Sequence, residues 1–265
     1  MLEIRNATKR FLQGTPNEHT ALDNLDLTLQ DGEFVTVIGS NGAGKSTLFN
    51  AICGNFFLDQ GTIRLDDTDI SYLPEHKRSK QIGRVFQDPM KGTAPHMTIE
   101  ENLALSYSRS KRTPLGIALK KKDKSFFQEA VAEFNMGLED RMHTKVGLLS
   151  GGQRQVITLL MCTLVPPKLL LLDEHTAALD PATSEKIMDI TKQIVSKHHL
   201  TTMMITHNIT SALETGNRTI MMDSGRIILD IGENARSSMS MNDLLELYSK
   251  KSNKVFDNDR MLLVK

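Results

Sequence analysis

Cysteine is scarce in this chain, which has two cysteines among 265 residues. Cys53 and Cys162 lie in apolar stretches with helical character. They have neither the spacing of metal ligands nor the pattern of a disulfide framework. We therefore expect both to be small buried hydrophobic residues in a reducing compartment.

A long apolar run is also missing. The most apolar stretch, residues 156–172, is interrupted by Pro166, Pro167 and Lys168. It therefore lacks the roughly 18 uninterrupted apolar residues of a membrane-spanning helix. The first residues do not have the pattern of a signal peptide. If the protein serves a membrane, we expect another chain to supply the membrane-spanning part.

The chain carries no net charge, because 32 Lys and Arg residues balance 32 Asp and Glu residues. No overall positive field exists to attract nucleic acid, which disfavours a DNA-binding function. The contents of 39% hydrophobic and 24% charged residues are ordinary for a soluble globular protein. The length allows one large domain or two small ones, and no internal repeat is visible.

Apolar periodicity and turn signals predict an α/β fold. Strands are expected at residues 25–29, 33–38, 61–65, 81–86, 168–172, 202–206, 219–222 and 227–230. Helices are expected from Lys45 to a C-cap at Gly54, and at residues 98–108, 124–134, 153–164, 181–197 and 241–249. We predict a single domain over residues 1–250. Its α/β core comprises about 1–90 and 165–235, a mostly helical subdomain of about 91–164 is inserted, and a charged tail covers 251–265.

A glycine-rich loop lies between a predicted strand and a predicted helix. It fits the pattern G-x-x-x-x-G-K-[ST] and consists of Gly39, Ser40, Asn41, Gly42, Ala43, Gly44, Lys45, Ser46 and Thr47. Backbone N–H groups of such a loop close around phosphate oxygens, and the helix N-terminus adds positive potential. We expect Lys45 to neutralise the β- and γ-phosphates and Ser46 to ligate Mg²⁺.

Two further motifs follow in the chain. Asp173 and Glu174 end an all-leucine strand, where a polar task at the carboxyl end explains two adjacent acids. Ser150, Gly151, Gly152 and Gln153 begin a predicted helix, and this second helix N-terminus is also suited to an anion. The glycine loop, the run from Leu149 to Gln155 and the acid pair occur in this order and once each.

Together these motifs resemble the nucleotide-binding subunit of an ABC transporter over nearly the whole chain. The resemblance implies a P-loop NTPase core of the ABC type with an N-terminal antiparallel β-subdomain and an inserted helical subdomain. It implies that ATP and Mg²⁺ are the cofactors. Asp173 would hold the metal and Glu174 would be the general base that polarises the attacking water, a role worth about 10²–10⁴-fold in rate.

Three further residues gain roles from the resemblance alone. Gln87 follows a predicted strand, as the glutamine of the Q-loop does, and would reach both Mg²⁺ and the water. His207 takes the position of the switch histidine that contacts the γ-phosphate. Phe11 lies where the family keeps an aromatic ring that stacks on adenine, although a core position explains it equally well.

The resemblance also implies partners. A head-to-tail homodimer would place each ATP between the glycine loop of one subunit and the Ser150 run of the other, with residues 177–180 as the D-loop at the seam. A separate permease would hold the protein at the cytoplasmic face of the membrane, and a substrate-binding protein would act indirectly. No nucleic acid is expected as a partner.

His175 departs from the family, which usually has proline after the catalytic glutamate. We expect a tolerated variant, because histidine neither fixes φ nor removes an N–H. The run from Asp173 to Pro181 is similar to that of a subgroup of bacterial importer ATPases, for which aromatic amino acids are among the suggested substrates. Basic residues between 109 and 124 are expected to form a solvated face, with anionic lipid headgroups as an alternative contact.

Three other functions are weighed against an importer ATPase. A soluble ABC-type ATPase that acts on DNA or ribosomes would carry a long coiled coil or two motif sets, and neither is present. A non-hydrolysing regulatory module would tend to lose Lys45 or Glu174. An exporter ATPase stays open, because the permease decides the direction of transport.

Overall fold

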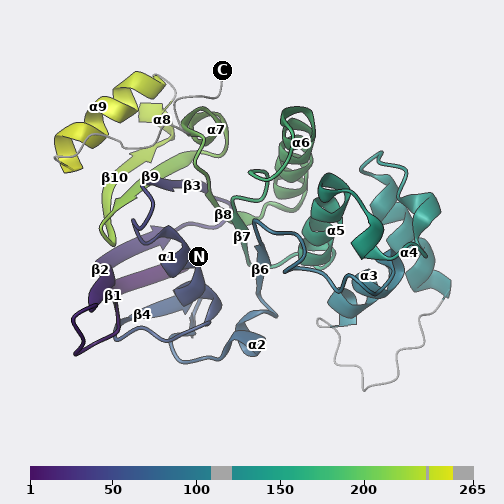
Figure 1. Cartoon of the computed structure of the whole chain (residues 1–265), viewed down its shortest axis with the longest axis horizontal. Coiled ribbons are helices and arrows are strands. Elements are labelled where there is room, and N and C mark those ends of the chain that lie inside the picture. The colour runs from purple at the N-terminus through teal and green to yellow at the C-terminus, as the bar shows by residue number, and fades with distance from the viewer. Residues whose placement is uncertain (109–120, 237–238, 253–265) are drawn as a thin grey trace. The chain divides into compact units, whose positions relative to one another are not determined.

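The computed structural model describes residues 1–108, 121–236 and 239–252 (Figure 1). The chain divides into two compact units. The first comprises residues 1–79 and 201–265, and the second comprises residues 80–200. Each unit is described by itself. The predicted boundaries of the helical subdomain, about 91–164, stay a prediction.

An antiparallel sheet occupies the N-terminal part of the first unit, in the order β2-β1-β4-β5. Its strands are β1 (Leu2–Phe11), β2 (His19–Leu29), β4 (Gln60–Leu65) and β5 (Thr68–Asp69). In the central strand Ile4 lies opposite Leu27 on one side and Ile63 on the other, and all three are buried. The predicted antiparallel β-subdomain is thereby confirmed, with strand β1 as an addition.

The first unit contains a second set of strands, and one of them, β3 (Phe34–Gly39), leads into the glycine loop. Strand β3 pairs in parallel with β8 (Thr201–Ile205) and with β9 (Arg218–Asp223). Strand β10 (Arg226–Gly232) is antiparallel to β9 across the predicted Ser224–Gly225 turn. All six residues of β3 are buried, as expected for a strand inside a parallel arrangement.

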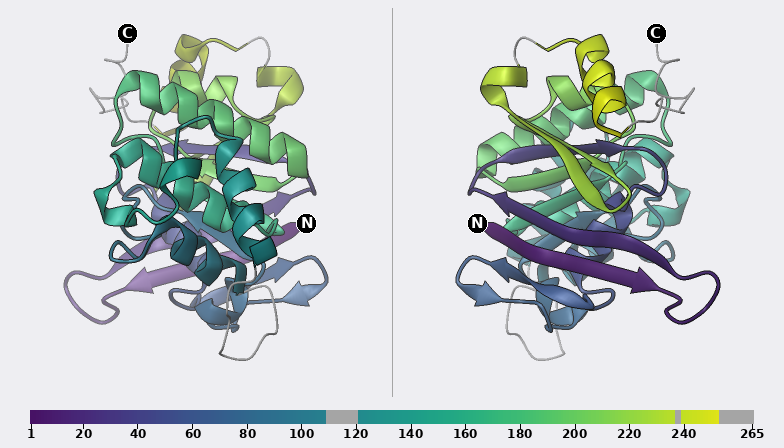
Figure 2. Two further views of the ribbon diagram at one scale, coloured as in Figure 1. Left: turned by 90° about the vertical axis from the view of Figure 1, so that its right-hand side faces the viewer. Right: turned by 90° about the vertical axis from the view of Figure 1, so that its left-hand side faces the viewer.

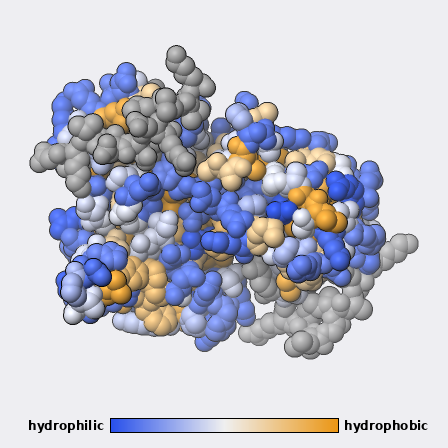
Figure 3. All heavy atoms as spheres, viewed as in Figure 1, coloured by the Kyte–Doolittle hydropathy of each residue, from blue (hydrophilic) through white to orange (hydrophobic). Residues whose placement is uncertain are grey.

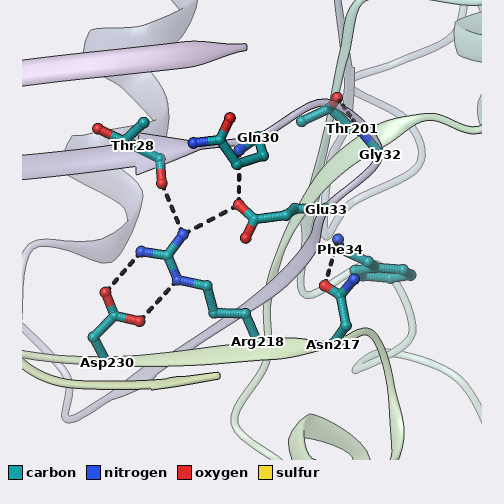
Figure 4. Close-up of polar contacts among 9 residues, drawn as sticks. All are labelled: Thr28, Gln30, Gly32, Glu33, Phe34, Thr201, Asn217, Arg218 and Asp230. Carbon is teal, nitrogen blue, oxygen red and sulfur yellow. Dashed lines mark hydrogen bonds and ion pairs between the residues drawn. The ribbon is translucent and has the colours of Figure 1, made fainter. Parts of the chain in front are cut away.

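Arg218 of β9 connects its strand to β10, to β2 and to the residue that precedes β3 (Figure 4). Its guanidinium donates to the Asp230 carboxylate at 2.8 and 2.7 Å and to Glu33 at 3.1 Å. It also donates to the backbone carbonyl of Thr28 at 2.7 Å. The hydrogen bonds with Asp230 raise the pKa of Arg218 above its ordinary value. The start of β3 is therefore tied to β2, β9 and β10.

Five helices of the described residues belong to the first unit. They are α1 (Lys45–Cys53), α2 (Glu75–Arg78), α7 (Ile209–Glu214), α8 (Glu233–Arg236) and α9 (Met241–Ser252). Helix α1 ends at Gly54 with φ 83°, as predicted. Leu244 and Tyr248 of α9 are buried against a cluster that includes Ile38, Ile209 and Met221. Figure 2 shows α9 beside the β9–β10 hairpin.

The second unit joins two parallel strands to the remaining helices. Strands β6 (Ile82–Val85) and β7 (Leu169–Asp173) pair in parallel, with Val85 opposite Leu172. The helices are α3 (Ile99–Ser108), α4 (Lys121–Ala132), η1 (Glu139–Arg141), η2 (Val146–Leu148), α5 (Gly151–Thr163) and α6 (Pro181–His198). The four leucines of β7 are fully buried, as their all-apolar pattern predicted.

The structure bears on two expectations from the sequence, one for the cysteines and one for the basic stretch. Cys53 is buried, as expected, but Cys162 is only partly buried, and its thiol donates to the carbonyl oxygen of Arg84 at 3.2 Å. Most of the basic stretch, residues 109–120, lies outside the described residues. Lys124, the last basic residue of the stretch, forms an ion pair with Glu100, with its Nζ 2.7 Å from the Glu100 Oε1.

On the face drawn in Figure 3 most of the coloured residues are hydrophilic, and hydrophobic residues form small groups. Among the described residues, none of the helices combines the length and the apolar character that crossing a membrane requires.

Candidate functional site

The glycine loop leads from β3 into α1 within the first unit. Gly44 is the N-cap of α1 and has φ 99°, a conformation that side chains rarely adopt. A Cβ atom at this position would lie 2.5 Å from the carbonyl oxygen of Ala21. No side chain caps the N-terminus of α1. The loop therefore requires glycine here and presents a helix N-terminus suited to an anion.

Lys45 is the first residue of α1, and its side chain is buried. Its ammonium group donates to the carbonyl oxygens of Gly39 at 2.7 Å and Ser40 at 2.9 Å. These two bonds hold the ammonium at the loop. The next residue, Ser46, is exposed.

His207 lies at the same edge of the first unit as the glycine loop. Strands β3 and β8 are parallel neighbours with Val37 opposite Ile205, so their carboxyl ends adjoin. Thr206 donates its N–H to the carbonyl of Val37 at 3.2 Å. Asn208 then caps α7 by accepting from Ser211 N–H at 2.9 Å. His207 is thus held between a strand end and a capped helix.

Phe11 ends β1, and its ring already has aromatic neighbours. It stacks on His19 with ring centroids 5.5 Å apart and meets the edge of Phe56 at 5.4 Å. The ammonium of Lys9 lies 5.6 Å from the ring centroid. Phe11 is half-buried, and its stacking on adenine stays a prediction.

The second unit carries the acid pair at the carboxyl end of β7. Asp173 is half-buried, and its carboxylate accepts from the Arg84 guanidinium on β6 at 2.7 Å. The Arg84 guanidinium also lies over the Phe86 ring, 4.8 Å from its centroid. Glu174 follows with φ 48°, in the left-handed region. The acid predicted to hold the metal therefore has an arginine as its counter-ion in this structure.

Gln87 follows β6 and is exposed. Since β6 and β7 are parallel with Val85 opposite Leu172, Gln87 and Asp173 lie at the same edge of the second unit. Gln155 of α5 reaches this segment by donating to the carbonyl of Phe86 at 3.2 Å. The helix that begins with the Ser150 run is thereby linked to the Q-loop.

The N-terminus of α5 is closed by its own side chains. Ser150 accepts from the N–H of Gln153 at 3.2 Å, and Gln153 accepts from the N–H of Ser150 at 3.2 Å. This reciprocal pair is a capping box. Gly152 packs closely on α6, since an added Cβ atom would lie 2.3 Å from a methyl carbon of Thr183. The run therefore has a structural role as well as the predicted nucleotide role.

Two arginines with evident roles were not among the predicted site residues. Arg78 is fully buried, and desolvation lowers its pKa. It donates to the carbonyl oxygens of Ala51 at 2.7 Å and Ile52 at 2.9 Å, at the end of α1, and to those of Ser71 and Leu73. It fixes the C-terminal end of the helix that the glycine loop begins. The second of these arginines is Arg84, the counter-ion of Asp173.

Fold and site together define a phosphate-loop nucleotide-binding protein. The model of the family described as "ABC transporter" matches residues 22–177, more than half of the chain. The chain belongs to the ABC transporter family.

Two relatives and one solved structure show how far the similarity extends. The chain is 42% identical over 248 residues to a tyrosine transport ATP-binding protein of Clostridioides difficile (strain R20291), covering 94% of this chain and 98% of the relative. It is 34% identical over 232 residues to the spermidine/putrescine import ATP-binding protein PotA of Haemophilus ducreyi (strain 35000HP / ATCC 700724). That match covers 87% of this chain and 57% of the longer relative.

The solved structure is the ATP-binding cassette MJ0796, described as a dimer in a post-hydrolysis state bound to ADP and Pi. Its TM-score is 0.76 at 28% identity, with 88% of this chain and 99% of the other covered. The predicted fold class is confirmed, and the chain is an ABC ATPase that couples ATP hydrolysis to transport.

Proposed function

We propose that this ABC ATPase powers the import of an amino acid as a head-to-tail homodimer beneath a separate permease, at the cytoplasmic face of the membrane. The observation that carries the proposal is the 42% identity, over 98% of its length, to a relative named for tyrosine transport. A substrate-binding protein would deliver the cargo to the permease. The domain boundaries and the residue roles are part of the same proposal.

Lys45 binds the phosphates of ATP, Glu174 is the general base, and His207 contacts the γ-phosphate. The position of Lys45 at an uncapped helix N-terminus supports the first role. The positions of Glu174 and His207 directly after strands β7 and β8 support the other two. Charge stabilisation and positioning carry most of the catalysis in such phosphoryl transfer.

The side chains proposed for Mg²⁺ are the hydroxyl of Ser46, the carboxylate of Asp173 and the amide oxygen of Gln87. All three offer oxygen, the ligand atom that Mg²⁺ prefers. The metal fits this donor set, and a single carboxylate is typical where substrate phosphates complete the coordination. When bound, Mg²⁺ would neutralise charge on the β- and γ-phosphates.

Replacement of the general base tests the catalytic assignment. Glu174→Gln is expected to keep ATP binding and to lose most turnover, by about 10²–10⁴-fold. Mg-ATP should then trap a dimer on gel filtration. Near-normal phosphate release by this variant would remove Glu174 from the base role.

A mixing experiment tests whether the Ser150 run acts across the dimer. One subunit carries Lys45→Ala and the other carries Ser150→Arg. If the run acts on ATP held by the partner, the mixed pair has one ruined and one intact site, and hydrolysis should return. If it acts within one chain, both sites stay defective and the mixture is silent.

The cargo is tested with a permease and a substrate-binding protein identified as partners of this chain. The complex is reconstituted in liposomes, and ATP hydrolysis is measured with tyrosine, a second amino acid or spermidine. An amino acid should stimulate hydrolysis and enter the liposomes. Stimulation by spermidine alone would favour the polyamine importers instead, and outward movement of the cargo would make the protein an exporter ATPase.

A further inference from the structure

We propose that His175 is a positioning residue for Glu174. Its buried ring, hydrogen-bonded to Thr191 in the middle of α6, holds the turn that keeps Glu174 in its left-handed conformation. The inference rests on the proposed role of Glu174 as the general base.

Glu174 has a conformation that the surrounding structure must maintain. Its φ of 48° lies in the left-handed region, where the Cβ atom of a non-glycine residue crowds the following carbonyl oxygen. Strand β7 ends one residue earlier, so sheet pairing does not extend to it. One hydrogen bond of the turn, from Ala177 N–H to the Glu174 carbonyl, measures 3.0 Å. Strained residues at functional sites persist only where neighbouring groups hold them.

His175 supplies such a restraint. The residue is 2% exposed, and its Nε2 lies 3.1 Å from the hydroxyl oxygen of Thr191, which is fully buried. The single proton of that hydroxyl is donated to the carbonyl of Ile187 at 2.8 Å. The Thr191 oxygen therefore accepts from His175, and Nε2 carries the ring proton.

Helix α6 is a stable element to which the turn is attached. It has 18 residues, with Pro181 in its first turn and Asp180 as its N-cap. The Asp180 carboxylate accepts from the N–H of Thr183 at 3.0 Å. The segment from Glu174 to Asp180 is thus attached to α6 twice, at its beginning by His175 and at its end by the N-cap.

This arrangement gives a physical reason for histidine at position 175. A proline there, usual in the family that the chain resembles, fixes its own φ through the ring. His175 provides a hydrogen bond to a neighbouring helix in place of that covalent restraint. The expectation of a tolerated variant did not include this contact with Thr191.

Three variants test the bond. His175→Met removes the donor at similar volume, Thr191→Val removes the acceptor, and His175→Gln retains an N–H donor. Misplacement of a catalytic group costs up to about 100-fold, and we expect the first two variants to lower kcat by about 10-fold or more, with KM unchanged. His175→Gln should recover most of the loss. Thermal unfolding and ATP affinity establish that each variant is folded.

The same substitutions in the Glu174→Gln background separate positioning from general stability. If His175 acts through Glu174, His175→Met should not lower the residual turnover of Glu174→Gln any further. An equal fold-loss in both backgrounds, or an unchanged kcat in folded Thr191→Val, would overturn the inference. Glu174→Gln alone tests the base role, so failure of that assignment is distinguishable from failure of the inference about His175.

Discussion

Helices α1 and α5 both begin with a glycine-containing motif suited to phosphate, but their ends are built differently. The N-terminus of α1 has no side-chain cap, and its C-terminal carbonyls are held by the buried Arg78. The N-terminus of α5 is closed by the capping box of Ser150 and Gln153. The first helix is thus prepared for a ligand before one arrives, while the second satisfies its own N–H groups.

From this difference we expect the two motifs to act at different times. An anion that meets the first turn of α1 finds no side-chain N-cap there. At α5 it must replace hydrogen bonds that Ser150 and Gln153 already make. We therefore expect ATP affinity in a single chain to depend on α1, and α5 to engage only when the closing dimer compensates for the lost cap.

Removal of Arg78 should have the largest effect, because α1 loses the anchor at its far end. Arg78→Met removes this donor from the carbonyl oxygens of Ile52, Ser71 and Leu73, while the Ala51 carbonyl keeps the N–H of Gly54. Unsatisfied buried groups cost about 1–3 kcal/mol each, so we expect unfolding free energy to fall by about 3 kcal/mol or more. Urea denaturation measures this. Exposed Arg64→Met is the control and should change stability little; a small effect at Arg78 would mean that α1 needs no such anchor.

Alanine in place of glycine contrasts the two helix starts directly. Gly44→Ala forces a side chain into a left-handed conformation, which costs about 1–2 kcal/mol before any clash is counted. The clash with the Ala21 carbonyl adds to that. Gly151→Ala is the matched control, since its Cβ atom would meet only the end of the Leu179 side chain at 3.3 Å. Equal losses of denaturation free energy would contradict the contrast.

Lys45→Ala should weaken ATP binding itself. Charge-assisted hydrogen bonds contribute about 1.5–3 kcal/mol, which corresponds to roughly 10- to 100-fold in affinity. Isothermal titration calorimetry on the single chain is the measurement, and Lys192→Ala, an exposed lysine of α6, is the control. Unchanged affinity in Lys45→Ala would show that α1 does not hold the phosphates.

Loss of the capping box should have the smallest effect. Ser150→Ala removes a side-chain N-cap, which costs about 1 kcal/mol. At this chain length that shifts Tm by about 2–4 °C. ATP affinity of the single chain should stay the same, as measured by calorimetry, while hydrolysis by the dimer falls. Weaker ATP binding in the monomer would mean that α5 already contributes before the dimer closes.

Local signals in the sequence predicted most elements well. Gly54 marked the end of α1, and Ser224–Gly225 marked the β9–β10 turn. Strand β1 was not singled out, because its alternation is broken by register irregularities between Ile4 and Ala7, where Asn6 has φ 50°. Helix α7 has six residues, too few to show a helical period.

The motifs likewise located the candidate site residues, but not their neighbours. The glycine loop follows β3 and the acid pair ends β7, as predicted. Arg84 and Asp173 are 89 positions apart, so only the parallel pairing of β6 and β7 brings them together. His175 and Thr191 meet because a turn folds back onto α6. Such contacts depend on tertiary packing, which the spacing of residues along the chain does not reveal.

The Arg84–Asp173 ion pair has a consequence for the order in which ligands arrive. A carboxylate without a counter-ion at the end of a strand would attract divalent cations from solution. In this protein the guanidinium of Arg84 already pairs with the Asp173 carboxylate, and both side chains are largely shielded from water. If Asp173 holds the metal, as we propose, a free ion gains little by displacing Arg84 alone. A metal that enters already chelated by nucleotide phosphates would bring its own ligands, so we would expect Asp173 to take the metal together with its nucleotide in preference to the free ion.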